Sequence, residues 1–208
     1  MSPASREPLL LLVIVSGALV ISGINPYDRL TWLLEVLPVL IGVPILVITY
    51  RAFPLTPLLY GLLFIHALIL IMGGHFAYAR VPLGFWLQDL LHLSRNHYDR
   101  LGHFAQGFVP AMLIREILIR RAVLADRNWL FFIVICICLA VSAFYELIEW
   151  WTALLAGQGA NEFLATQGDV WDTQWDMLLA LLGAITAQLI LARWQDRELQ
   201  EVTTAAGR

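Results

Sequence analysis

Residues 57–78 read PLLYGLLFIHALILIMGGHFAY, a run of 22 positions without Asp, Glu, Lys or Arg. A helix that crosses the hydrocarbon core of a bilayer needs roughly 20 consecutive, mostly apolar residues. The run therefore predicts a transmembrane helix that begins at Pro57. The whole chain of 208 residues agrees, because 60% of it is hydrophobic, 14% is charged and the mean hydropathy is +0.74. This composition leaves too little polar surface for an ordinary soluble domain.

The same criterion applied outward along the chain predicts six spans, at about 9–24, 30–50, 57–78, 101–120, 129–152 and 174–194. We therefore predict an all-α, polytopic membrane protein that forms a single six-helix domain over residues 1–208, with short cytoplasmic tails. The first span is short and follows Arg6, so a secretory signal peptide is the alternative to an uncleaved anchor there. Between the third and fourth spans, residues 82–92 predict an amphipathic helix that lies in the membrane interface.

The arginines indicate the orientation, because the chain has no lysine. Nine arginines fall on the side of both predicted termini and four on the opposite side, so the positive-inside rule predicts cytoplasmic termini. The opposite side holds ten of the sixteen acidic residues and has a formal charge of −6, against +3 on the side of the termini. A face this negative attracts cations.

Residues 95–107, RNHYDRLGHFAQG, form the first of three polar segments on the acidic side. Asp99, His103 and Gln106 are spaced four and three apart, so they share one face if a helix starts near Tyr98. A carboxylate and an imidazole one turn apart can share a metal ion or act as an acid/base pair. The alternative is that Asp99 caps the helix and orients a buried histidine.

The second segment is YELIEWW at residues 145–151. Its two carboxylates, Glu146 and Glu149, are three residues apart and repel unless one is protonated or a cation lies between them. The alternative is an interfacial acid beside a belt of tryptophans.

The third segment is QGDVWDTQWDM at residues 167–177. A continuous helix would place Asp169, Asp172 and Asp176 on one stripe. The alternative is that these acids only interact with the helix dipole, which favours negative charge in the first turn of a helix. This alternative explains Asp176 poorly, because Asp176 lies one turn deeper. Oxygen ligands favour magnesium, calcium or manganese, and histidine would also admit zinc.

The predicted site draws on these segments and on two further residues at the same depth, His75 and Glu35. The predicted metal ligands are His75, Asp99, His103, Glu149, Asp169, Asp172 and Asp176. The predicted catalytic residues are Asp99, His103, Glu146, Glu149, Asp172 and Asp176. The predicted substrate-binding residues are Arg95, Asn96, Arg100, Gln106, Tyr145, Trp150 and Gln174.

Four strings, IHALILIMGGHFAYARVP, RNHYDRLGHFAQGFVPAMLIRE, YELIEWW and QGDVWDTQWDM, resemble those of the YjdF-type family of bacterial inner-membrane proteins. The resemblance extends from about Pro26 to Gly183 and implies a multi-pass protein of the bacterial inner membrane. More distantly, the order of the polar positions is similar to that of the VanZ-like group, which implies a role in the cell envelope. The positions concerned are Asp99, His103, either Glu146 or Glu149, Asp172 and Asp176.

These patterns predict a site near the periplasmic side that binds a divalent cation, namely magnesium, manganese, calcium or zinc. No serine or cysteine nucleophile stands in the motifs, so an activated water would attack an envelope lipid or a lipid-linked substrate. The predicted partners are membrane lipids and this substrate, and no nucleic acid. A transporter or lipid-binding protein without chemistry is the first alternative, and a purely structural polar network is the second.

Overall fold

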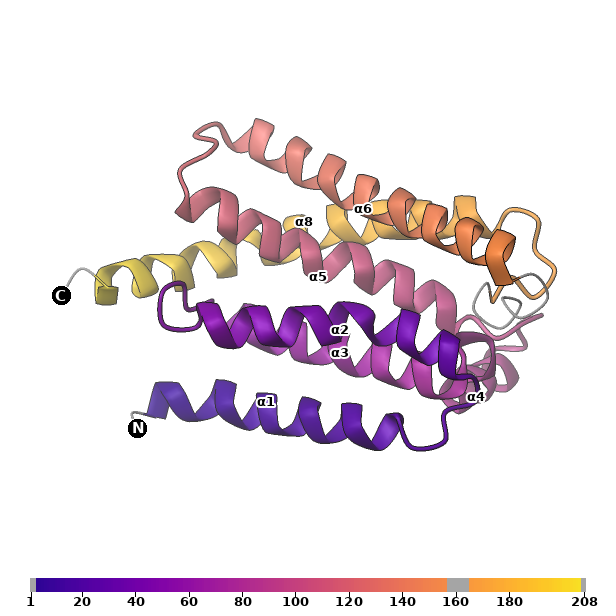
Figure 1. The fold of residues 1–208 in the computed structure, drawn as a ribbon. Helices are drawn as coiled ribbons and strands as arrows, with labels where there is room; N and C mark the ends of the chain where they lie inside the picture. The colour runs from indigo at the N-terminus through magenta and orange to yellow at the C-terminus, as the bar shows by residue number, and fades with distance from the viewer. Residues whose placement is uncertain (1–2, 157–164, 207–208) are drawn as a thin grey trace.

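The computed structural model describes residues 3–156 and 165–206, and every regular element in these ranges is helical. The elements are α1 (Pro3–Ser22), α2 (Arg29–Thr49), α3 (Pro57–Phe76), the 3-10 turn η1 (Tyr78–Arg80), α4 (Pro82–Leu91), α5 (Tyr98–Arg120), α6 (Arg127–Ala156) and α8 (Asp172–Ala206). Figure 1 shows the long helices side by side, with the start of α1 and the end of α8 at one end. We call this the terminal end and the opposite end, where α4 lies, the site end. Residues 157–164 of the predicted connection before the last span lie outside the described residues.

Four helices are long and apolar enough to cross a membrane, by length and composition, among the residues described. They are Arg29–Thr49, Pro57–Phe76, Arg127–Leu155 and Asp172–Val202. The predicted first span is a shorter apolar stretch, Glu7–Ser22, and the predicted span at 101–120 does not reach the same threshold. The structure thus confirms an all-helical membrane protein and gives four clear candidate spans; the count of six stays a prediction.

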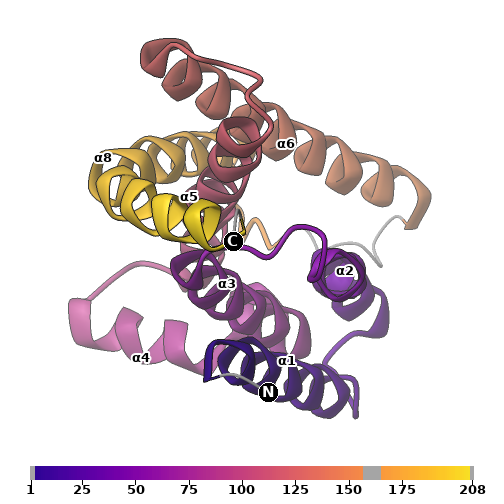
Figure 2. The same cartoon turned by 90° about the vertical axis from the view of Figure 1, so that its left-hand side faces the viewer.

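The position of α5 explains its polar composition. It packs against α3, α6 and α8, and Figure 2 shows it between these three helices. Its polar side chains therefore contact protein, which is how charged groups are accommodated at membrane depth.

Two glycines allow α5 and α8 to pack closely. A Cβ atom on Gly107 would overlap the backbone carbonyl of Ala180, and one on Gly183 would overlap the carbonyl of Phe104. Small residues at such crossings let helix backbones approach one another in membranes. The contact brings the first turns of α5 and α8, and with them several acidic residues, to the same end of the bundle.

A second polar network closes the terminal end. Glu116 is fully buried and accepts hydrogen bonds from the Thr56 amide (3.1 Å), the Thr56 hydroxyl (2.8 Å), Arg120 (3.1 Å) and Gln195 (3.4 Å). Both oxygens of the buried Glu116 carboxylate accept hydrogen bonds, so the group stabilises the fold instead of destabilising it. This network joins the start of α3 to α5 and α8.

Helix α8 is longer than the span predicted at 174–194, since it continues to Ala206. Gln195 donates to the Met112 carbonyl (2.8 Å), and Glu198 accepts from the Leu58 amide (2.9 Å). The first amides of a helix have no partner within it, so Glu198 supplies one for α3. The segment after residue 194 was predicted as a short tail. These contacts keep it helical.

Helix α4 confirms that the segment predicted at residues 82–92 is helical. It buries Gly84, where a Cβ atom would overlap the side chain of Asn96. Phe85 and Trp86 are exposed.

Candidate functional site

Four helices bring six carboxylates and one imidazole together near the site end. We call this group the acidic cluster; its members are Glu35 from α2, Asp99 and His103 from α5, Glu146 and Glu149 from α6, and Asp172 and Asp176 from α8. Glu149 is half-buried, and the exposed fractions of the others lie between 2% and 8%. The predicted convergence of acidic residues from separate helices is therefore present.

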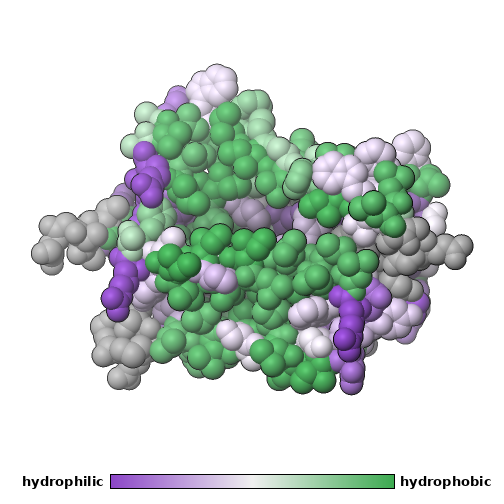
Figure 3. Space-filling model, viewed as in Figure 1, coloured by the Kyte–Doolittle hydropathy of each residue, from purple (hydrophilic) through white to green (hydrophobic). Residues whose placement is uncertain are grey.

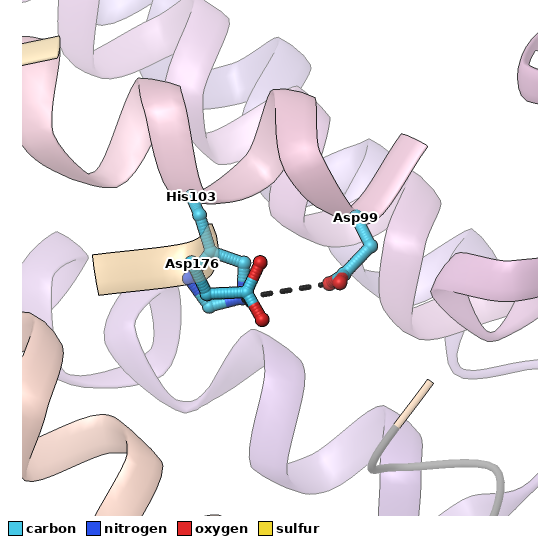
Figure 4. Close-up of side chains that lie close together, drawn as sticks. All are labelled: Asp99, His103 and Asp176. Atoms are coloured by element: carbon cyan, nitrogen blue, oxygen red, sulfur yellow. Dashed lines mark ion pairs between the residues drawn. The ribbon is translucent and has the colours of Figure 1, made fainter. Parts of the chain in front are cut away.

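His103 lies at the centre of the cluster. Its Nε2 atom is 3.5 Å from Asp99 Oδ1 and 3.8 Å from Asp176 Oδ2, and Figure 4 shows the three side chains facing one another. Helix α5 starts at Tyr98, which meets the condition for the shared face, and no side chain hydrogen-bonds as its N-cap, so Asp99 does not cap it. Asp99 instead faces the imidazole one turn away.

Gln106 orients the imidazole from its other side. The Nδ1 atom of His103 lies 2.9 Å from Gln106 Oε1. An amide oxygen can only accept, so it holds the proton on Nδ1 and directs Nε2 toward the carboxylates. Gln106, predicted to bind substrate, thus acts on His103.

The donor atoms form two overlapping triads around this imidazole. The first is Asp99, His103 and Asp176, and the second is His103, Glu146 and Glu149. Within each triad, one ligand atom per residue lies within 4.8 Å of the others. Three donors at this separation can converge on one metal ion after small side-chain rotations.

Two oxygens of the cluster have no hydrogen-bond partner. They are Glu146 Oε1 and Asp176 Oδ1, and both atoms are buried. A buried carboxylate oxygen without a partner is costly, and native structures rarely leave one unsatisfied.

Asp169 is outside the helix that was predicted to carry it. Helix α8 begins at Asp172, so the predicted stripe of three aspartates is wrong for Asp169. Its Oδ1 accepts from the Trp171 amide (3.0 Å), and its Oδ2 lies 3.0 Å from Arg100 and 3.3 Å from Arg95. Side chains at turns readily make such local bonds to the backbone, which compete with helix formation. Asp169 is therefore engaged by two arginines rather than grouped with the predicted metal ligands.

Arg95 connects the loop before α8 to the cluster. Its guanidinium contacts the Thr166 carbonyl (3.0 Å), Asp169 (3.3 Å) and Asp172 Oδ1 (2.9 Å). These three contacts hold the loop before α8 against the cluster. The two arginines predicted to bind substrate thus form ion pairs within the protein, and Arg100 also lies 5.1 Å from the ring centroid of Trp175.

His75 has a different neighbourhood from the predicted ligand set. Its Nδ1 atom lies 2.8 Å from the Ser22 carbonyl, and its ring packs edge-on against Phe76. The contact joins the end of α3 to the end of α1.

The other predicted substrate-binding residues lie around the cluster. Asn96 is buried and donates to the Val81 carbonyl (3.0 Å), so it joins the starts of α4 and α5. The Tyr145 hydroxyl donates to the Leu34 carbonyl of α2 (2.9 Å). Trp150 and Gln174 are exposed.

Tyr78 is a site residue that the sequence reasoning missed. Its ring occupies the space that side chains at Gly73 and Gly102 would fill, and its hydroxyl hydrogen-bonds Glu35. Burial, and next the Glu35 carboxylate, raise the pKa of this hydroxyl well above its usual range, so it remains a donor. The only signal in the sequence was the glycine pair Gly73-Gly74 shortly before Tyr78. Gly102 lies on another helix, so its contact with the Tyr78 ring depends on the tertiary structure.

His97 adds a neutral group to the loop before α5. Burial, followed by the charges of Arg100 and Arg95, lowers the pKa of this imidazole. The positive charge beside the acidic cluster therefore comes from the two arginines rather than from His97.

The fold and site define a helical membrane protein with a buried acidic cluster at one end. The family described as "Predicted membrane protein (DUF2238)" matches residues 7–197, and the chain belongs to it. The chain is 56% identical over 189 residues to the "Inner membrane protein YjdF" of Escherichia coli (strain K12), covering 91% of this chain and 90% of that relative. No solved structure matches. These findings confirm the predicted family resemblance and identify the chain as an integral inner-membrane protein.

Proposed function

We propose that the acidic cluster binds a divalent cation at His103. The observation that carries this proposal is the pair of unpartnered, buried oxygens, Glu146 Oε1 and Asp176 Oδ1. They belong to the two triads that share His103, one in each. A cation held at His103 by one triad or the other would offset the buried negative charge that these oxygens carry.

The balance of charge supports the same proposal. Among the ion pairs of the described residues, Arg95 is the arginine that reaches the cluster, and it contacts Asp172. The five remaining carboxylates have one imidazole between them. Carboxylates buried together repel one another, and a divalent ion offsets two negative charges without adding steric bulk.

The donor types narrow the class of ion. The triads offer carboxylate oxygens and one imidazole nitrogen, and the Gln106 contact leaves the lone pair of His103 Nε2 free to bind a metal. Oxygen-rich sites suit magnesium, manganese and calcium, and a mixed His/carboxylate set also suits zinc.

The enzymatic form of the proposal is hydrolysis of a phosphate ester in an envelope lipid or lipid-linked substrate. A bound divalent cation would polarise the phosphoryl oxygen and lower the pKa of a water molecule. The water oxygen attacks phosphorus, the phosphorus–oxygen bond to the lipid alcohol breaks, and the alcohol oxygen takes up a proton. A carboxylate of the cluster that does not bind the ion would accept the proton of the water and pass it to the alcohol oxygen.

A recess on one face of the molecule supports the entry of a lipid substrate from the bilayer. Figure 3 shows a recess between the surface over α6 and that over α2, with pale and purple atoms at its floor and apolar surface around it. The Tyr145 hydroxyl bridges to α2 at the Leu34 carbonyl. A substrate that enters between these helices stays within the bilayer until it reaches the cluster.

A transporter or non-catalytic lipid-binding protein is the second candidate. Buried acids in membrane helices often mark an ion path. However, the network around Glu116 fills the terminal end with groups that bond one another, so the polar path does not continue openly through the described helices. This observation favours a site that opens on one side.

The test is metal binding by purified protein after chelation. We expect the parent to bind about one manganese or zinc ion per chain, and Asp176→Asn and Glu146→Gln each to lower the affinity by roughly tenfold or more. Asp89→Asn is the matched control, because Asp89 is an exposed acid on α4 outside the cluster. Equal metal content in the parent, both cluster variants and the control would overturn the proposal.

Thermal stability separates the structural alternative from a functional site. A network that only holds the bundle together should lose stability in both cluster variants, whereas a functional site often gains stability when a charge is removed. We therefore expect the melting temperature of metal-free Asp176→Asn to equal or exceed that of the metal-free parent.

We further propose that α1 and α5 complete six spans, with both termini in the cytoplasm and α4 in the interface. The arginine asymmetry and the central position of α5 support this topology. Periplasm-dependent reporters fused after Leu93 and after Ala122 test it. Activity after Leu93 and inactivity after Ala122 are expected, and the reverse pattern would contradict the proposed orientation.

A further inference from the structure

A cavity of about 400 Å³ lies between α1, α2 and α3, away from the acidic cluster. Its lining is apolar except for three residues, Tyr50, Arg51 and Tyr60. These three lie at the end of α2, just after it and at the start of α3, which places them together at the terminal end. The cavity is therefore polar at one end only.

The three helices are fastened to one another at the site end. Trp32 Nε1 donates to the Ser22 hydroxyl (3.0 Å), and the Ser22 carbonyl contacts His75 Nδ1 (2.8 Å). Val36 and Ile71 belong to a buried apolar core at the same depth. The site-end halves are thus packed, and the unfilled space lies in the terminal halves.

The cavity extends over a similar length of all three helices. The lining runs from Pro8 to Val15, from Val43 to Arg51 and from Tyr60 to Ala67, which is eight or nine residues, or seven or eight helical steps, in each case. At 1.5 Å per residue, these segments measure about 10–12 Å along the helix axes. The cavity therefore extends from the terminal end to about a third or half of the way across the bilayer.

We propose that this cavity binds one acyl chain of an anionic phospholipid from the leaflet at the terminal end, with the lipid phosphate against Arg51. A water molecule needs two to four polar partners, which the apolar part of the lining does not offer. Within hydrocarbon, the available occupant is an acyl chain, and an unfilled cavity would lose the dispersion contacts of its lining.

Arg51 makes the site selective for an anionic headgroup. It is exposed, and no ion pair recorded among the described residues includes it. Tyr50 and Tyr60 line the same end of the cavity and pack against each other with ring centroids 6.2 Å apart. Tyrosine is enriched at the headgroup level of membranes. An exposed guanidinium that lines the same end of the cavity as two tyrosines suits an anionic headgroup whose tail enters the cavity.

The experiment measures phospholipid bound to purified protein by native mass spectrometry and by extraction. Ala67→Trp fills the cavity, and Ile65→Trp is the matched control, because Ile65 is exposed on the same helix and does not line the cavity. We expect the parent and the control to retain about one phospholipid per chain and Ala67→Trp to lose it.

Arg51→Gln tests the headgroup contact without filling the cavity, and Arg193→Gln is its control as an exposed arginine at the same end. Titration of delipidated protein with dioleoylphosphatidylglycerol should be weakened about fivefold by Arg51→Gln, since one arginine near an anionic surface has roughly this effect. Titration with dioleoylphosphatidylcholine should not change.

Equal lipid retention by Ala67→Trp and the parent would overturn the proposal. So would a change from dimer to monomer in Ala67→Trp without loss of lipid, which would assign the cavity to a second copy of the chain. If Ala67→Trp fails to fold, equal affinity of the parent for the two probe lipids is sufficient to reject the proposal. None of these outcomes depends on the metal content of the acidic cluster.

Discussion

Replacing Arg95 by methionine should destabilise the protein by about 3 kcal/mol, because it leaves the carboxylate of Asp172 without a cation. The two charges are 2.9 Å apart, and their side chains are 12% and 6% exposed. Breaking a buried ion pair costs about 3–5 kcal/mol, and the residual exposure of Arg95 places this pair at the low end. The lost contact between Arg95 and Asp169 adds little to this cost in stability, because Arg100 remains 3.0 Å from Asp169.

A double-mutant cycle isolates this pair. Asp172→Asn alone should cost about 0 kcal/mol, because Arg95 keeps its contact with Asp169. Arg95→Met with Asp172→Asn should cost only about 1 kcal/mol, since the unpaired charge is then removed, so the coupling energy is about 2 kcal/mol. Arg100→Gln is the matched control and should cost about 1 kcal/mol or less, because its ion pair is partly exposed. The assay is equilibrium unfolding in mixed micelles with a chelator present. The reasoning is refuted if Arg95→Met costs no more than Arg100→Gln, or if the double variant costs the sum of its singles.

Three further predictions test the packing, the imidazole and the terminal network. Gly107→Ala should cost about 3 kcal/mol in the same unfolding assay, since its Cβ atom would overlap the Ala180 carbonyl, and a cost near zero would contradict the close crossing. Gln106→Leu should weaken manganese binding about tenfold in a titration, because His103 loses the acceptor of its Nδ1 proton, and an unchanged affinity would argue against this role. Glu116→Gln should cost about 2 kcal/mol and leave metal content unchanged, and loss of metal would show that the two ends are coupled.

The sequence predicted best where the relevant geometry is local. Asp99 and His103 are four residues apart on one helix, so their meeting required only the start of α5 to be placed near Tyr98. The prediction for Asp169 was wrong because it assumed a helix through position 169. The turn bond to the Trp171 amide and the two arginines hold that residue outside the helix.

Residues brought together by tertiary contacts were harder to predict. His75 lies at the same end of the bundle as the cluster, but it faces the end of α1 through Ser22. Tyr78 reaches Glu35 because glycines on two different helices leave room for its ring. Neither result follows from spacing along the chain.

The sequence by itself determined the helices, the membrane environment and the end of the bundle at which the acidic residues gather. It can do so because each span runs across the bilayer, so a position along a span sets a depth. The tertiary structure alone decided which helices are neighbours at that depth. Close packing at Gly107 and Gly183 puts α5 against α8, and this lateral arrangement turns acids of equal depth into one cluster around His103.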